Sequence, residues 1–377
     1  MKRRSHRRRG NIIVISALLM VGLIGFLALA IDVGYLYSVR AELQRSADAA
    51  AIAAAWELID KDGAAGQQNA TTLGTNARSK ASQFASLNGV GSCAPALATD
   101  DVVVGYMANP ANPSDPLVAT PPGGMPNAVQ VRVQRTSAQN GQVPLFFAKA
   151  LGHDQAELEA QATAALVSSF IGFESPADGT NLNILPFALD EDTWDGLTTF
   201  GNDSWRYNPS SKTVTAGCDN IKEVNLYPQG TGCPGNRGTV DIGSSNNSTA
   251  DIARQILYGI TESDLSFLGG SLCFCDDGIV HLNGDTGISA GVKDELTSII
   301  GKPRMIPIFR SVVGPGNNAD YSIVKFVGVR IMEVKLTGSM SSKRVIIQPC
   351  NVIAKGGIYQ QNATSSQYIY SPVWLAR

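Results

Sequence analysis

Few side chains in this sequence have types and spacing that could do acid–base or nucleophilic chemistry. His281 follows Asp276 and Asp277 and precedes Asp285, and a histidine oriented by a carboxylate can act as a general base toward a serine. Residues 287–291, Gly-Ile-Ser-Ala-Gly, have the Gly-x-Ser-x-Gly spacing of a nucleophilic serine, but this spacing alone does not establish the strand-to-helix turn that such a serine needs. A catalytic triad around His281 is therefore the weaker interpretation of this cluster.

Acidic residues offer two further candidate sites. The aspartates around His281, together with Asn283, could bind calcium through oxygen ligands, but their spacing does not match an EF-hand loop. Residues 191–195 bring three carboxylates close to Trp194, and closeness in sequence does not establish the separation that paired catalytic carboxylates need. Because aspartate and asparagine are common in turns, we predict solvated loops at both places. We assign no catalytic, cofactor-binding or metal-binding residue, and the chain is not predicted to be an enzyme.

Six cysteines, five of them after residue 200, could form disulfides if the chain is exported to an oxidising compartment. The disulfide candidates are Cys218, Cys233, Cys273, Cys275 and Cys350. The sequence does not distinguish among the pairings that they allow. Inert buried thiols are the alternative, and the tight spacing of Cys273 and Cys275 argues against a zinc site.

The overall charge balance argues against a nucleic-acid-binding protein. The 377 residues include 30 basic and 32 acidic side chains, for a formal net charge of −2, whereas surfaces that bind nucleic acid are strongly basic. Only 16% of the residues are charged, and 38 are glycine. This composition fits a β-rich exported domain better than a cytosolic enzyme.

An apolar segment near the N-terminus predicts a transmembrane helix. Residues 12–31 contain no charge, and a helix of this length spans about 30 Å, the thickness of the hydrocarbon core of a bilayer. Most of the first nine residues are basic, which predicts a cytoplasmic N-terminus and an exported C-terminal part by the positive-inside rule. The lipid bilayer is thus a predicted partner. We assign to the anchor and its exit Ile12, Phe26, Ile31, Asp32, Tyr35 and Tyr37.

Two processing events are alternatives to a retained anchor. The tripeptide at 28–30, Ala-Leu-Ala, is similar to a signal-peptidase site, although the apolar segment is longer than a typical signal-peptide core. Gly10 before an apolar helix is similar to the cleavage site of type IV prepilins, but Ile15 stands where that pattern has a glutamate. We expect the helix to be retained.

The helical pattern continues beyond the apolar segment. Apolar residues recur every three or four positions at Leu36, Val39, Leu43, Ala47, Ala50, Ala54 and Leu58. This spacing predicts one long helix over residues 12–59, and its alanines allow another backbone to approach closely. The apolar face either packs on the chain's own domain or mediates self-association through residues 36–59.

Three motifs follow one another in residues 8–56. They are Arg-Gly-Asn at 9–11, Asp-Val-Gly-Tyr-Leu-Tyr at 32–37, and an alanine-rich run at 44–55 that begins with glutamine. Their order resembles the N-terminal domain of TadG-like proteins, in the TadE/TadG group of the Tad (Flp-type) tight-adherence pilus system. A weaker similarity to that group covers residues 143–152 and 160–164. The resemblance implies a single-pass protein of the bacterial inner membrane whose partners are other pilus or secretion assembly proteins.

Hydrophobic patterning places an α+β fold after the anchor. A helix at 77–87, strands at 101–107 and 128–135, a short helix at 146–151 and a strand at 155–170 form a pilin-like α+β unit. A β-rich α+β domain follows, with a strand at 182–189, helices at 248–260 and 289–300, and long strands at 304–313, 321–337 and 343–354. Residues 323–336 are apolar on both faces, which predicts a central strand.

The predicted organisation has five parts. They are a basic cytoplasmic tail at 1–11, a transmembrane helix at 12–31, the pilin-like unit at 32–171, a linker at 172–181 and the β-rich extracytoplasmic domain at 182–377.

The sequence is compatible with two functions. The favoured one is a membrane-anchored structural or assembly component of a Tad (Flp-type) pilus or an associated secretion apparatus. The alternative is an envelope-anchored enzyme or ligand-binding protein whose activity lies in the C-terminal domain, in the periplasm or outside the cell.

Overall fold

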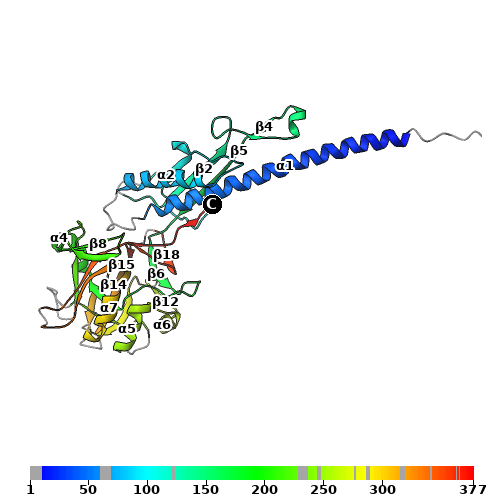
Figure 1. The fold of residues 1–377 in the computed structure, drawn as a ribbon. Helices are drawn as coiled ribbons and strands as arrows, with labels where there is room; N and C mark the ends of the chain where they lie inside the picture. The colour runs from blue at the N-terminus through cyan, green and yellow to red at the C-terminus, as the bar shows by residue number, and fades with distance from the viewer. Residues whose placement is uncertain are drawn as a thin grey trace, which may run out of the picture.

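The computed structural model shows two units, with one long helix projecting from the first of them (Figure 1). The structure describes residues 11–59, 69–120, 124–227, 237–243, 248–275, 277–285, 289–314, 319–339, 342–361, 363–364 and 366–377. The N-terminal unit contains two helices and a four-stranded sheet, and the C-terminal unit contains most of the remaining strands. The predicted fold class is confirmed: a long apolar N-terminal helix leads into an α+β unit and then into a β-rich C-terminal part.

Helix α1 (Asn11–Trp56) runs without a break from the apolar segment into the N-terminal unit. At the usual rise per residue its 46 residues extend over about 69 Å. The helix ends three residues before the predicted position, 59. Its N-terminal half projects away from both units, whereas its C-terminal half lies on the sheet (Figure 1).

Four antiparallel strands form the sheet of the N-terminal unit. Their order is β1 (Val102–Gly105), β2 (Ala128–Arg135), β5 (Leu158–Ala165) and β21 (Trp374–Leu375). Helices α1 and α2 (Ala70–Leu87) both contact this sheet. The alternating valines of β2 are fully buried, and they belong to the same core as the fully buried alanines of α1. Small side chains on the helix therefore let it lie close to the sheet.

A closed ring of five strands forms the centre of the C-terminal unit. In order around the ring these are β15 (Ala319–Lys335), β13 (Val280–Asp285), β11 (Arg237–Val240), β7 (Phe187–Asp190) and β14 (Pro303–Val313), which pairs again with β15. Only the pairing of β7 with β14 is parallel within this ring. Strands β16 (Arg344–Pro349) and β10 (Val224–Tyr227) extend the sheet from β15.

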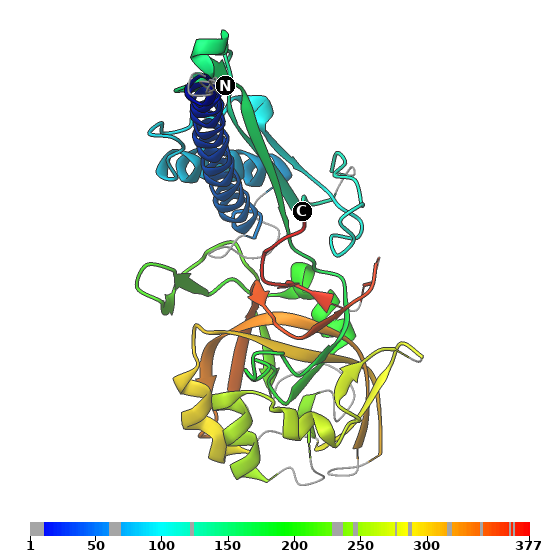
Figure 2. The same ribbon diagram turned by 90° about the vertical axis from the view of Figure 1, so that its right-hand side faces the viewer.

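The longest strand, β15, is covered on both faces. Ile323 and Phe326 belong to one hydrophobic core, and Val327 and Val329 belong to another. Helices α5 (Thr249–Tyr258) and α7 (Lys293–Ser298) contribute to the second core, and they pack on each other beside the sheet (Figure 2). The prediction of a central strand at 323–336 is therefore confirmed.

The capping residues set the ends of these helices. Ser248 precedes α5 and its side chain accepts a hydrogen bond from the N–H of Asp251. The predicted helix at 289–300 is present as η3 (Ala290–Val292) followed by α7, whose C-cap is Ile299, and Gly301 follows with a φ of 81° that favours glycine. The remaining described elements are η1 (Thr99–Asp101), β3 (Val143–Pro144), η2 (Ala148–Leu151), β4 (Gln155–Ala156), β6 (Phe170–Glu174), α3 (Glu191–Asp195), α4 (Leu197–Phe200), β8 (Trp205–Asn208), β9 (Thr213–Ala216), α6 (Glu262–Ser266), β12 (Ser271–Cys273), β17 (Val352–Ile353), β18 (Gly357–Tyr359), β19 (Ser366–Gln367) and β20 (Ile369–Tyr370).

Two details bear on the predicted division of the chain at 172–181. The first residues of that range belong to β6, which pairs with β12 and β18 in a three-stranded sheet. The C-terminal end of the chain returns to the N-terminal unit, where β21 pairs with β5 and the N–H of Thr163 donates to the carbonyl of Arg377 at 2.7 Å. The chain thus crosses between the units at both 166–170 and 370–374.

Candidate functional site

The predicted anchor is exposed along its whole apolar segment. Large apolar side chains from Ile12 to Leu29 are each between 55% and 74% exposed, with Phe26 at 74% and Ile31 just after them at 43%. Among the residues that the structure describes, α1 is the one helix long and apolar enough to cross a membrane. A contiguous apolar surface of this size is costly in water, so the helix suggests a membrane anchor. The basic tail at 1–10 lies outside the described residues.

Burial of α1 begins at Asp32, the first residue after the apolar segment. Only 2% of Asp32 is exposed. Its carboxylate accepts hydrogen bonds from the backbone N–H groups of Phe146 at 2.9 Å, Phe147 at 2.9 Å and Ala148 at 2.6 Å. These groups lie at the start of η2, where backbone donors lack partners within the helix and a carboxylate is a favourable acceptor. Asp32 therefore joins the exit of the apolar segment to a turn more than a hundred residues away in the chain.

The surroundings of Asp32 hold it in its charged form. Desolvation by burial acts to raise the pKa of Asp32, but the N–H groups of Ala148, Phe146 and Phe147 lower it by more. The pKa of Asp32 consequently lies below its usual value of 3.8. Because the pKa is depressed in the folded state, the contribution of Asp32 to stability is present above the unfolded pKa and is lost only as the pH falls through the folded one.

The two predicted exit tyrosines have different environments. The ring of Tyr35 packs edge-on against the ring of Phe146, with centroids 5.2 Å apart. Tyr37 is 71% exposed. Further along α1, the carboxylate of Glu42 accepts a hydrogen bond from the N–H of Gly91 at 2.7 Å. Successive polar contacts of this kind fix the rotation of α1 on the N-terminal unit.

The alanine-rich face of α1 is buried inside the chain's own domain. Val39, Leu43, Ala47, Ala50 and Ala54 are each at most 1% exposed. They form one core with alanines of α2 and with the sheet. Of the two alternatives for this face, packing within the domain is the one seen in the structure. Self-association through residues 36–59 stays a prediction, and it would have to use the exposed side of the helix.

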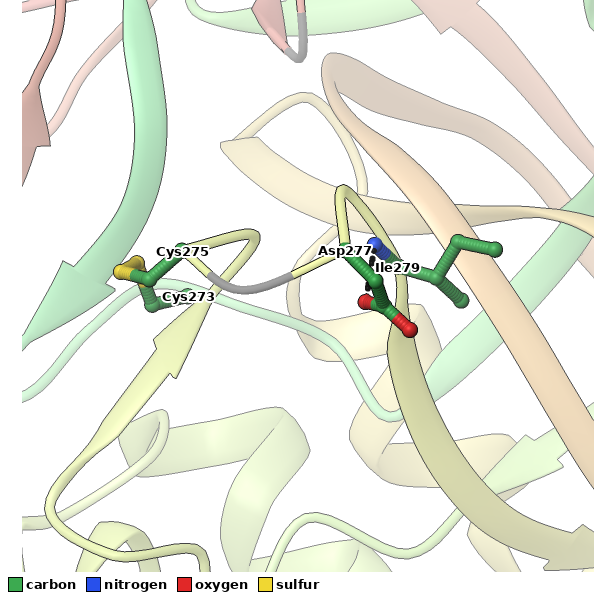
Figure 3. Close-up of a disulfide and its surroundings, with 4 residues drawn as sticks. All are labelled: Cys273, Cys275, Asp277 and Ile279. Atoms are coloured by element: carbon green, nitrogen blue, oxygen red, sulfur yellow. Dashed lines mark hydrogen bonds between the residues drawn. A yellow bond between two sulfur atoms is a disulfide. The ribbon is translucent and has the colours of Figure 1, made fainter.

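The cysteines lie in several settings. Cys273 and Cys275 form a disulfide at the end of β12, with Cα atoms 5.1 Å apart (Figure 3). Cys218 is an exposed free thiol, and Cys350 is a buried free thiol whose pKa is raised by burial. Cys233 lies outside the described residues. One pair of the disulfide candidates is therefore bonded, and Cys350 has the environment of an inert buried thiol.

The residues around His281 are spread over an exposed surface. The Nδ1 atom of His281 lies 3.2 Å from the carboxylate of Asp320, and the two side chains are 55% and 53% exposed. Asp277 accepts a hydrogen bond from the N–H of Ile279 at 3.0 Å within its own turn (Figure 3). Asp276 lies outside the described residues. The described residues thus form a turn beside an exposed histidine. They do not form a pocket that gathers a base and two carboxylates.

The carboxylates at 191–195 pair with basic residues. Glu191 accepts a hydrogen bond from Arg310 at 2.8 Å, which with the nearby cations holds the pKa of this carboxyl below its usual range. Asp195 pairs with Lys325 at 2.8 Å. Trp194 is buried and donates to Gln367. The cluster therefore fixes α3 onto β14 and β15.

The structure brings together a third acidic cluster that the sequence did not indicate. Carboxylate oxygens of Asp203, Asp219 and Glu223 lie within 4.8 Å of one another. Burial raises the pKa of Glu223, which accepts hydrogen bonds from the N–H groups of Ser204 and Trp205. Their oxygens are hard ligands of the type that calcium prefers, but they already serve as acceptors for the surrounding loop. No local spacing signal in the sequence could have identified this cluster.

A long uncovered apolar helix that is built into an α+β unit suggests a membrane-anchored protein. Comparison with family models is more specific. Residues 10–57 match the Tad family, Flp pilus-assembly TadE/G-like, and residues 44–164 match the Tad_C family, Tad-like Flp pilus-assembly. These matches cover residues 10–164, less than half of the chain, and they support the similarity to TadG-like Flp/Tad pilus-assembly proteins that the N-terminal motifs predicted. No curated protein and no solved structure gave a significant match.

The matched residues coincide with one part of the fold. The match to Tad covers α1, and the match to Tad_C runs from the buried half of α1 to β5. Together they account for the N-terminal unit except for its last strand, β21. These family domains support a role in pilus assembly and suggest a structural, non-enzymatic protein.

Proposed function

We propose that this protein is a single-pass component of the bacterial inner membrane that serves the assembly of a Tad (Flp-type) pilus or an associated secretion apparatus. In this proposal residues 12–31 cross the membrane, the basic N-terminal tail stays in the cytoplasm, and both folded units lie in the periplasm or outside the cell. Its partners are the lipid bilayer and other assembly proteins.

The observation that carries the proposal is the continuity of α1. One helix is uncovered over the apolar segment, and from Asp32 onward it packs one face on the N-terminal unit. Because no loop separates the two halves, movement or tilt of the membrane-spanning half is transmitted directly to the sheet. This geometry supports a structural part that holds a domain at a fixed position on the membrane.

The proposal can be tested by deletion and crosslinking in the bacterium that makes the protein. We expect deletion of the gene to abolish or strongly reduce Flp-type pili, as counted by electron microscopy, and the intact gene supplied in trans to restore them. A crosslinked sample extracted from membranes should contain other pilus assembly proteins. Normal piliation in the deletion strain, together with a crosslinked sample that lacks those proteins, would contradict the proposal.

A further inference from the structure

A β-hairpin of the N-terminal unit carries an exposed apolar tip. Strands β3 and β4 pair antiparallel, and η2 lies between them. Gly152, with a φ of 87°, closes the turn after η2. At this tip Phe146, Phe147 and Leu151 are 60%, 46% and 80% exposed. These exposures match those of the apolar residues along the projecting half of α1, so the tip is uncovered in the same way.

The position of this tip is set by Asp32. The carboxylate of Asp32 accepts hydrogen bonds from three consecutive N–H groups at the tip, and Phe146 packs on Tyr35 one turn further along α1. Asp32 is also the first residue after the apolar segment. Both views show the hairpin beside α1, beyond the edge of the sheet (Figure 1, Figure 2). The exposed side chains of the tip therefore lie beside the point where the apolar segment of α1 ends.

We propose that this tip, residues 145–152, inserts into the interfacial layer of the membrane that α1 crosses, on the side of the folded units. The inference rests on the proposed function, because it takes α1 as the membrane-spanning helix. Phe147 and Leu151 enter the boundary between headgroups and acyl chains, where apolar side chains next to a membrane surface are buried by about 5–10 Å.

Continuity and charge favour a lipid surface as the occupant. The apolar tip adjoins the end of the uncovered apolar segment of α1, because Asp32, the charged residue at this junction, is only 2% exposed and its carboxylate is covered by the N–H groups of the tip. Lys149 is exposed on the same turn and can reach a headgroup phosphate while its aliphatic part lies along the apolar layer. The transmembrane helix and the hairpin tip fixed to its end would together define the tilt of the N-terminal unit on the membrane.

The test uses the full-length protein in phospholipid vesicles and reads the depth of an added tryptophan. Three variants are compared with the parent, whose four native tryptophans give the background. They are Leu151→Trp at the tip, Phe26→Trp in the apolar segment, and Phe200→Trp at an 85% exposed position of α4 in the C-terminal unit. The lipids carry bromine, a short-range quencher, near the glycerol end of the acyl chains.

We expect the added fluorescence of Leu151→Trp to fall by roughly half or more, because its ring would lie within about 5–10 Å of the headgroup boundary. Phe26→Trp should also be quenched, and Phe200→Trp should keep its full intensity. If Phe26→Trp is quenched but Leu151→Trp behaves as Phe200→Trp does, the tip faces water or protein, and the inference fails while the anchor stands. If Phe26→Trp is not quenched, α1 does not cross the bilayer, and both the anchor and the inference fail.

Discussion

The two units of this protein differ in the side chains that fill their cores. The main buried core of the N-terminal unit consists of alanine, valine, leucine and isoleucine, and it holds the helices α1 and α2 close to the sheet. The core of the C-terminal unit adds aromatic rings to its aliphatic side chains, with Phe170, Phe173, Phe274, Phe309 and Phe326 in one cluster. A core of small residues positions a backbone closely and tolerates no added volume, whereas a core of large rings tolerates no loss of volume.

The two units also differ in whether known family models match them. Family models match the N-terminal unit and stop at β5, while they leave the C-terminal unit unmatched. The N-terminal unit is thus the part of the molecule that is similar to Flp pilus-assembly proteins. Crosslinking would identify the proteins that contact the C-terminal unit.

The largest expected effect comes from truncating the aromatic core. Phe326 is fully buried, and its ring centroid lies 5.3 Å from that of Phe173 and 5.5 Å from that of Phe274. Phe326→Ala should destabilise the C-terminal unit by about 3–5 kcal/mol, since it removes a large side chain and leaves a cavity. Chemical denaturation of the detergent-solubilised protein measures this loss. Phe200→Ala, at an 85% exposed phenylalanine, is the matched control and should change stability by less than about 0.5 kcal/mol.

The converse change should damage the N-terminal unit. Ala50 is fully buried in the face of α1 that lies on the sheet. Ala50→Leu should cost about 1–3 kcal/mol because the added atoms force the helix and sheet apart. Ala41→Leu, at an exposed alanine of the same helix, is the control. Equal stability of the two variants would show that the helix does not pack closely through this face.

One carboxylate in each unit gives a pH test of the comparison. Desolvation, with the charges of Asp251 and Asp264, raises the pKa of Asp241 from 3.8 to about 6 in the C-terminal unit. The folded state therefore binds more protons than the unfolded state between these values, and the stability of the C-terminal unit should fall as the pH rises from about 4 to about 6. Asp241→Asn should flatten this dependence and raise the thermal midpoint at pH 7. A pH profile identical to that of the parent would contradict the assignment to Asp241.

The carboxylate of the N-terminal unit should behave in the opposite way. Asp32 has a lowered pKa, so its contacts with the tip of the hairpin should persist at neutral pH and weaken only when the pH falls below 3.8. Asp32→Ala should leave the N–H groups of Phe146, Phe147 and Ala148 without their acceptor and speed their hydrogen exchange, with a small effect on global stability. Asp48→Ala, which loses only a contact with Gln44, is the control. Unchanged exchange at residues 146–148 would show that Asp32 does not hold the hairpin.

Local patterns in the sequence predicted the elements that depend on neighbouring residues. The apolar periodicity of residues 12–59 predicted α1, Ser248 predicted the start of α5, and Gly301 predicted a turn that the structure has just after α7. The two-sided apolar pattern of residues 323–336 predicted the central position of β15. In each case the determining interactions lie within a few residues of the chain or follow from the period of one element.

Contacts between distant segments could not be predicted in the same way. Asp32 was assigned to the membrane exit from its position, but its three hydrogen bonds go to a turn 114 to 116 residues away. The parallel pairing of β7 with β14 closes the ring, and the pairing of β21 with β5 brings the last residues back to the N-terminal unit. Hydrophobic periodicity indicates which face of an element is buried, but it does not identify the element that covers it.

The most direct test of the account is the mass of the mature protein in its native membrane. The protein should be purified from membranes washed with alkaline carbonate, which releases peripheral proteins, and its intact mass should be measured. If α1 is a retained anchor, the protein stays with the washed membranes, and its mass includes residues 12–31. A protein that is released by the wash and whose mass begins at Ile31 would contradict the account, because cleavage after Ala30 would remove the anchor and leave only the folded units.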